Sequence, residues 1–392
     1  MQFTLSSPRQ VVVGGGVVAR IAETLAAFGL RRPLIVSDPF MVSSGLIQRC
    51  LAPLEKAGVP VAVFSDTVPE PVDTVVTAGV EVIARGDFDC LIGFGGGSPI
   101  DTAKAMAILA AGGGVMADYK VPREANLAAL PVIAIPTTAG TGTEVTRFTV
   151  ITDTARDEKM LIAGLAALPL AALVDYELTL SVPPRTTADT GVDSFTHALE
   201  AFVSRRANPY SDSMALAAMR LIGANLRRVY REPKDAAARE AMMLGATLAG
   251  LAFSNSSVAL VHGMSRPIGA HFHVPHGLSN AMLLPAVTRY GLQAALPRYA
   301  EAARAGGFAA AGDSDEAAAE ALARGLGALN ADLDVPGPRQ YGIDPAAWEA
   351  RLDLMAAQAL ASGSPANNPR IPDADEIKTL YREVWASGRN SQ

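Results

Sequence analysis

The chain has 392 residues, of which 49% are hydrophobic and 18% are charged. This length exceeds what one hydrophobic core accommodates, and the composition is that of a folded protein, so we expect two globular domains. The net charge of −6 comes from 33 basic and 39 acidic residues with no basic cluster, which argues against a nucleic-acid or anionic-membrane partner.

No segment predicts export or membrane insertion. The longest apolar run, LIAGLAALPLAALV, has 14 residues, fewer than the ~20 that span a bilayer. The segment MQFTLSSPRQ has no signal-peptide pattern, and the two cysteines, Cys50 and Cys90, form no disulfide or zinc motif. We therefore expect a cytoplasmic protein.

The first half of the chain alternates short apolar runs with amphipathic segments. The runs are RQVVVGGG, PLIVSD, VPVAVFSD, FDCLIGFGGG and LPVIAIPTT, and the helix-like segments between them are residues 17–28, 40–57, 72–85 and 99–110. Apolar strands separated by helices are typical of a parallel sheet covered on both faces, so we predict a Rossmann-like α/β domain. The segment RFTVITDTARDEKMLIA then has two β-rich runs around a charged turn and predicts a hairpin.

The pattern changes after ELTLSVPPR. From Thr186 onward the chain has long segments rich in Ala, Leu and Met with helical periodicity, beginning with residues 186–203, 209–230 and 236–253. No strand-like run follows. We predict an α/β domain over residues 1–183 and an all-α domain over residues 184–392, with the boundary at Pro183–Pro184.

Two glycine-rich turns are candidates for binding a dinucleotide. The turn VVVGGGVVA follows a predicted strand with Gly14, Gly16 and Ala19 at fingerprint spacing, and Asp38 lies about 20 residues further on, where an acid binds the ribose of NAD. The pattern alone favours this turn. The alternative for either turn is a glycine that is needed only for a positive φ.

The second turn, IGFGGGSPID, stands between a predicted strand and a predicted helix. Backbone N–H groups at such a helix start point toward a phosphate, and the helix dipole favours the negative charge. The segment PTTAGTGTEVT, residues 136–146, places small hydroxyl residues after another strand. Ligands collect at this edge of a parallel sheet, so the three segments together predict nucleotide binding. The residues of the second turn are Gly95, Gly96, Gly97 and Ser98.

A metal site is predicted in the helical half. Asp193 and His197 are four residues apart on a predicted helix, so they share one face and can bind one ion. Four of the five histidines lie in VHGMSRPIGAHFHVPHG, at positions 262, 271, 273 and 276. One Asp with three His suits Fe(II), Zn or Mn. Spacing alone does not choose His276 over His271 or His273.

The segments GGGSPID, PTTAGTGTEVT, TGVDSFTHALEAFVS and HGMSRPIGAHFHVPHG occur in this order, and the chain thereby resembles the iron-containing (group III) alcohol dehydrogenase family. The resemblance extends from Asp38 to about Pro285. It implies a dinucleotide-binding α/β domain and a helical domain with the active site in the cleft between them. It also implies that the metal ligands are Asp193, His197, His262 and His276, with no ligand role for His271 or His273.

The resemblance implies a different phosphate loop from the one that the pattern favours. Position by position, the pyrophosphate loop falls on residues 95–98, and Asp38 matches the ribose-contacting acid. An acid there predicts NAD in preference to NADP. Further implied cofactor contacts are Thr137, Thr138, Lys159, Thr179 and Val182.

The implied activity is a metal-dependent, NAD-linked interconversion of a primary or secondary alcohol and its aldehyde or ketone. The metal, expected to be Fe(II) with Zn and Mn as alternatives, acts as a Lewis acid on the substrate oxygen. The implied partner is a small alcohol or aldehyde, and the implied assembly is a homodimer or a larger homo-oligomer.

Two positions depart from the family pattern. Similar sequences often carry PNP where this chain has PEP, so Glu70 replaces an expected cofactor contact. They also commonly have a second histidine, linked to proton transfer, where this chain has Arg266. The Arg266 guanidinium suits an anionic group on a substrate, and a structural ion pair or a hydrogen bond to the backbone is the alternative.

Three other functions fit parts of the pattern. A maleylacetate-reductase-like enzyme or a hydroxyacid–oxoacid transhydrogenase-like enzyme would act on a carboxylate-bearing substrate, which Arg266 would suit. A non-catalytic protein that binds metal or nucleotide is the alternative of another class. The complete set of four ligands argues for alcohol chemistry over the maleylacetate-reductase-like enzyme, and the intact ligand set and phosphate loop argue against the non-catalytic protein. A transhydrogenase would be distinguished by a tightly retained cofactor and no need for free NAD.

Overall fold

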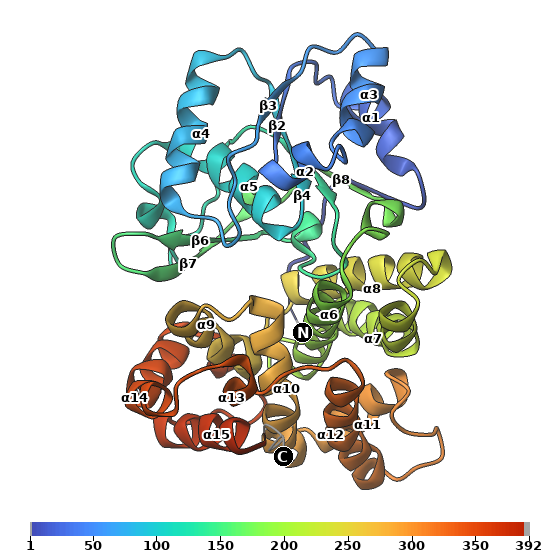
Figure 1. The fold of residues 1–392 in the computed structure, drawn as a ribbon, viewed down its shortest axis with the longest axis vertical. Helices are drawn as coiled ribbons and strands as arrows, with labels where there is room; N and C mark the ends of the chain where they lie inside the picture. The colour runs from blue at the N-terminus through green and yellow to red at the C-terminus, as the bar shows by residue number, and fades with distance from the viewer. Residues whose placement is uncertain (1, 388–392) are drawn as a thin grey trace. The chain divides into compact units, whose positions relative to one another are not determined.

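The computed structural model describes residues 2–387 and divides into two compact units, Met1–Ser181 and Val182–Gln392. The predicted boundary lies two residues further along the chain. Both units have the predicted class, since the first is built on a parallel sheet and the described part of the second is helical (Figure 1). None of the described helices is both long and apolar enough to span a bilayer.

The first unit is built on six parallel strands in the order β1-β8-β5-β4-β2-β3. A separate antiparallel pair, β6 and β7, forms the predicted hairpin. The strands of the sheet are β1 (Gln10–Val13), β2 (Pro33–Val36), β3 (Ala62–Phe64), β4 (Cys90–Gly95), β5 (Val132–Pro136) and β8 (Ala171–Val174), and those of the hairpin are β6 (Phe148–Asp153) and β7 (Glu158–Ala163).

Helices cover both faces of this sheet. The helices α4 (Asp73–Arg85) and α5 (Gly97–Gly112) pack on one face, and α1 (Ile21–Ala27) and α3 (Gln48–Lys56) pack on the other (Figure 1). Alternate residues of β2 follow the pleat, because Leu34 and Val36 join the first core while Ile35 joins the second. Burial on both faces explains why the strands are continuous apolar runs.

The structure differs from the predicted elements at three places. The expected helix 40–57 is two helices, α2 (Pro39–Ser43) and α3, because Gly45 adopts a left-handed backbone with φ 76° that ends α2. The expected helix 17–28 begins as a 3₁₀ turn before α1. The strand β8 was not predicted separately.

Helix α5 lies close against the sheet. A side chain at Gly93 of β4 would place its Cβ 2.9 Å from the Ile100 Cα, so only glycine fits there. This contact fixes the start of α5 at the carboxyl end of β4, and Pro99 occupies the first turn of the helix, where its missing N–H costs no hydrogen bond.

The second unit is helical throughout its described residues, 182–387. Helix α6 is buried along its last three turns and packs against α7, α8 and α10. The helices are α6 (Pro184–Val203), α7 (Pro209–Arg231), α8 (Ala236–Ser254), α9 (Leu260–Phe272), α10 (His276–Gly291), α11 (Leu296–Ala305), α12 (Asp315–Asp332), α13 (Pro338–Tyr341), α14 (Pro345–Ala361) and α15 (Ala374–Ser387).

Candidate metal centre and cofactor-binding edge

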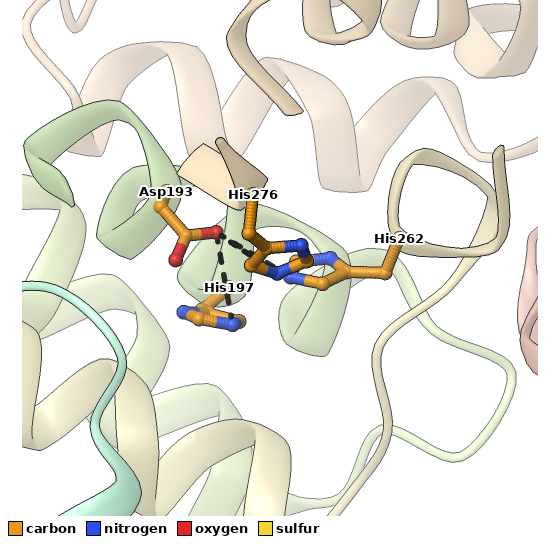
Figure 2. Close-up of side chains that lie close together, drawn as sticks. All are labelled: Asp193, His197, His262 and His276. Carbon is orange, nitrogen blue, oxygen red and sulfur yellow. Dashed lines mark ion pairs between the residues drawn. The ribbon is translucent and has the colours of Figure 1, made fainter. Parts of the chain in front are cut away.

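The four predicted metal ligands come together in the second unit. Asp193 and His197 lie on one face of α6, His262 lies in the first turn of α9, and His276 begins α10. Figure 2 shows the four side chains pointing toward one another, with dashed lines from Asp193 to the histidines. One ligand atom from each residue lies within 4.8 Å of all the others.

Tight helix packing places His276 beside α6. A Cβ at the next residue, Gly277, would lie 2.5 Å from the backbone oxygen of Asp189, so the start of α10 touches α6 one turn before Asp193. The ring of His197 is also held, since it stacks on Phe253 at 4.3 Å and on His262 at 4.5 Å between ring centroids.

The distances fit a single divalent ion. From the Asp193 Oδ1, the Nε2 atoms of His262, His197 and His276 lie at 3.5, 3.9 and 3.9 Å. Ligands that are each about 2.1 Å from one ion are separated by about 3.4 Å in a tetrahedron. The three distances from Asp193 are thus within about half an ångström of the tetrahedral separation.

The charges of the site favour a cation. Burial by itself would raise the pKa of Asp193, but His197, His276 and His262 lower that pKa well below its ordinary value. Burial works against charging His262, yet Glu200 and Asp193 raise its pKa to about 9. A buried cluster that stabilises positive charge in this way suits a metal ion.

Asn280 lies among the ligands and was not singled out in the sequence. Its Nδ2 donates to the Asp193 Oδ1 at 2.6 Å and lies 3.2 Å from the Nε2 atoms of both His262 and His276. Its own Oδ1 is buried without a hydrogen-bond partner. Three electron-pair donors thus converge on one small region, which is the arrangement that a metal ion needs.

Glu200 was also missed, although it lies on the same face of α6 as Asp193 and His197. Its Oε2 accepts from the His262 Nδ1 at 2.6 Å, and its carboxylate also accepts from the backbone N–H groups of Ala259 and Val261. A carboxylate only accepts, so the His262 Nδ1 carries a proton, and Nε2 is the ring atom that faces the other ligands. Glu200 thereby sets both the start of α9 and the ligand atom of His262.

We expect the Glu200→Gln substitution to weaken metal binding roughly 10- to 100-fold, because outer-shell partners of metal-bound histidines contribute about that much. The glutamine amide N–H can then face the protonated Nδ1 of His262, so that two donors oppose each other, or the His262 ring rotates to avoid this contact. Competition with a chelator measures the dissociation constant, and Glu240→Gln, at an exposed position of α8, is the control. An unchanged dissociation constant in folded Glu200→Gln would show that Glu200 has only a structural role.

The remaining candidates of α9 lie outside the cluster. The His271 Nε2 contacts the Gln358 Oε1 at 2.8 Å. His273 is exposed and ends α9 with a left-handed backbone, φ 53°. Arg266 donates to the Ser364 hydroxyl at 3.0 Å, and within residues 2–387 it forms no ion pair with a carboxylate. The pKa of Arg266 is lowered, because the effect of burial is larger than the opposing effect of the Glu200 charge.

Seven of the predicted cofactor residues lie at the carboxyl ends of three neighbouring strands, β2, β4 and β5: Asp38, Gly95, Gly96, Gly97, Ser98, Thr137 and Thr138. A Cβ on Gly95, where φ is 146°, would lie 3.4 Å from the Asp38 Oδ2, and one on Gly96 would lie 3.7 Å from the Thr138 side chain. The Thr137 N–H donates to the Gly95 oxygen at 2.8 Å. Asp38 uses its Oδ1 to cap α2 through the Met41 N–H at 2.9 Å, so its Oδ2 is the oxygen that faces this edge.

The first glycine turn has an internal anion. The Asp175 carboxylate accepts from the N–H groups of Gly16 at 3.0 Å and Val18 at 3.1 Å. Asp175 is fully buried after β8. The N–H groups of Gly16 and Val18, which the sequence pattern predicted to bind a phosphate, therefore already bind the Asp175 carboxylate.

The last three predicted contacts are spread over both units. Lys159 on β7 pairs with Glu70 at 2.9 Å. The Thr179 hydroxyl donates to the Tyr176 oxygen at 2.7 Å in the first unit. In the second unit, the Val182 oxygen accepts from Arg239 at 3.3 Å.

Comparison with known proteins identifies the family. Residues 8–176 match the family described as iron-containing alcohol dehydrogenase, and residues 187–385 match its C-terminal domain. The chain is 36% identical over 378 residues to the NAD-dependent methanol dehydrogenase of Bacillus methanolicus, covering 96% of this chain and 98% of that protein. It is 34% identical over 391 residues to the NADPH-dependent butanol dehydrogenase of Clostridium saccharobutylicum, covering 98% of each.

A solved structure agrees with the sequence comparison. The crystal structure of a 1,3-propanediol oxidoreductase superposes with a TM-score of 0.94 at 34% identity, covering 98% of this chain and 100% of that one. These matches extend through both units and include both the metal cluster and the glycine loop. The chain belongs to the iron-containing alcohol dehydrogenase family and is an oxidoreductase that interconverts alcohols with aldehydes or ketones.

Proposed function

We propose that the chain is an alcohol dehydrogenase, or an aldehyde reductase in reverse, that uses NAD and one Fe(II) held by Asp193, His197, His262 and His276. The observation that carries this proposal is the convergence of four ligand atoms within 4.8 Å in a mostly buried cluster that holds one ionised carboxylate. Zn and Mn suit the same ligands. Cytoplasmic location and a homo-oligomeric state stay predictions.

When bound, the ion supplies Lewis acidity that stabilises the negative charge of an alcohol oxygen as hydride leaves the neighbouring carbon for the nicotinamide. The chain's residues prepare this step. Asp193 stays ionised, and Glu200 accepts from the His262 Nδ1, so that Nε2 is the ring atom left to bind the ion. The His276 side chain is 36% exposed, whereas the Asp193 side chain is 3% exposed. We therefore assign substrate entry to the side of the site where His276 lies.

The cofactor assignment rests on the loop between β4 and α5. The loop has glycine at positions 95, 96 and 97, where a Cβ would contact neighbouring side chains. Because no Cβ is present, a phosphate can approach the start of the 16-residue helix α5. We assign the pyrophosphate to this loop and the ribose hydroxyls to Asp38. Thr137 and Thr138 line the same edge, and the Thr137 hydroxyl is buried without a hydrogen-bond partner.

An assay coupled to NADH absorbance tests the function. Metal-stripped protein is reloaded with Fe(II), Zn or Mn and screened with alcohols and aldehydes, both neutral and anionic. Anionic substrates are included because the Arg266 guanidinium has no carboxylate partner among residues 2–387. Turnover that requires metal supports the proposal, and bound metal and cofactor with no turnover of any substrate would favour a non-catalytic role.

Asp38 should set the preference for NAD. The 2′-phosphate of NADP would meet its carboxylate, and such like-charge contacts cost several kcal/mol. We expect Asp38→Asn, which retains an oxygen to cap Met41, to raise the NADP-to-NAD ratio of kcat/KM roughly ten- to a hundredfold. Asp87→Asn makes the same charge change at the opposite ends of the strands and is the control. No change of the ratio in Asp38→Asn would remove Asp38 from the cofactor site.

A further inference from the structure

The segment Pro69–Glu70–Pro71 lies beside the start of α5. The Glu70 N–H donates to the Ser98 hydroxyl at 3.2 Å, and the Pro71 oxygen accepts from the Thr152 N–H of β6 at 2.8 Å. The segment thus connects the glycine loop to the hairpin. Any group bound at the start of α5 lies near the Glu70 backbone.

Glu70 is held in an unfavourable backbone conformation. Its φ is 55°, in the left-handed region that favours Gly and Asn. Two prolines flank it and restrict the segment further. A bulky acidic residue at this position carries a conformational cost that asparagine would largely avoid.

The Glu70 carboxylate neutralises a cation at the cofactor edge. Lys159, whose side chain is 10% exposed, places its Nζ 2.9 Å from the Glu70 Oε1. On β7, Lys159 lies opposite Thr152, the residue that binds Pro71. The geometry therefore brings one ammonium, one carboxylate and the start of α5 together within a single unit.

We propose that Glu70 competes with the pyrophosphate for Lys159, so that the chain binds its dinucleotide more weakly than its phosphate loop allows. This inference rests on the proposed assignment of the pyrophosphate to residues 95–98. A phosphate that approaches Ser98 comes next to the Glu70 backbone, and the Lys159 charge there is already compensated by the Glu70 carboxylate. Binding then requires the ion pair to open or to share the ammonium.

Isothermal titration of the full chain tests this competition. We expect Glu70→Gln, which retains the side-chain length without the charge, to bind NAD and ADP-ribose about tenfold more tightly, as expected for one charge-assisted contact made available. Adenosine, which has no phosphate, should bind equally to both proteins. Glu70→Asn should give the same gain and a higher melting temperature, because asparagine suits the left-handed backbone.

Two further variants isolate the ion pair. Lys159→Met should weaken NAD binding, and adding Glu70→Gln to Lys159→Met should restore less than the gain seen in the wild-type background. Glu158→Gln is the matched control, because Glu158 precedes Lys159 but pairs with Lys120. It should leave the affinity for NAD unchanged.

The possible outcomes separate this inference from the function on which it rests. If wild type binds NAD and Glu70→Gln binds it equally well, the competition is wrong while the cofactor assignment stands. A gain that extends to adenosine, or that persists fully without Lys159, also overturns the competition. If wild type binds neither NAD nor ADP-ribose, both the competition and the cofactor assignment fail.

Discussion

His262→Ala is expected to lose its bound metal and about three orders of magnitude in turnover. The substitution removes one of four ligands, and the Lewis acidity of such an ion is worth several kcal/mol of transition-state stabilisation, with about 1.4 kcal/mol for each factor of ten. The loss should come mainly from kcat. Metal content by elemental analysis and steady-state kinetics measure the two effects.

The control for this substitution is another histidine of the same segment. His273 is exposed and has a left-handed backbone, which asparagine tolerates, so His273→Asn removes an imidazole with little strain. It should retain both metal and turnover. A His262→Ala protein with stoichiometric metal and full activity would contradict the ligand assignment.

Lys104→Met is expected to destabilise the protein by about 3–5 kcal/mol, because breaking a buried charge network leaves uncompensated partners. Lys104 is fully buried in α5. Its Nζ donates to the backbone oxygens of Thr143, Thr146 and Phe148 at 2.6 to 3.0 Å. Burial lowers the pKa of Lys104 to about 8, against the opposing charges of Asp101 and Glu144, so the ammonium is charged at neutral pH.

Urea denaturation followed by circular dichroism measures this loss. Lys56→Met, at the exposed end of α3, is the control and should change the unfolding free energy by less than about 0.5 kcal/mol. A loss below about 1 kcal/mol in Lys104→Met would mean that the segment of residues 143–148 is held to α5 by other contacts.

Much of the fold could be predicted because burial leaves a local pattern. Strands covered on both faces are continuous apolar runs, and the helices between them are amphipathic, so the alternation was sufficient for the α/β class. β8 was not predicted separately because the 14-residue apolar run from Leu161 to Val174 contains the end of β7, a 3₁₀ turn and β8. Periodicity does not divide a run that is apolar throughout.

The glycine turns show why local pattern can mislead. The turn at Gly14–Gly16 fits the dinucleotide fingerprint better, but its N–H groups bind Asp175, which lies 159 residues from Gly16. No local rule predicts a partner at that separation. The second turn, between β4 and α5, has the helix start and the neighbouring strand ends that a phosphate site needs.

The metal site was predictable only in part. The spacing of Asp193 and His197 on a helix gave two ligands, and three residues after His197 the same reasoning could have found Glu200. The choice of His276 came from the family resemblance. Spacing could not make this choice, because α9 ends at His273 with a left-handed backbone and the helical periodicity does not continue to His276. Asn280, one turn into α10, became visible only through its contacts.

The most direct measurement of the central claim is turnover as a function of bound metal. Chelator-stripped protein is titrated with Fe(II) in the presence of NAD and an alcohol that the screen has identified. Turnover should rise in proportion to bound metal and level off at one ion per chain, as the single cluster of four ligands requires. Full turnover by metal-free protein, or turnover that does not follow metal content, would contradict the account.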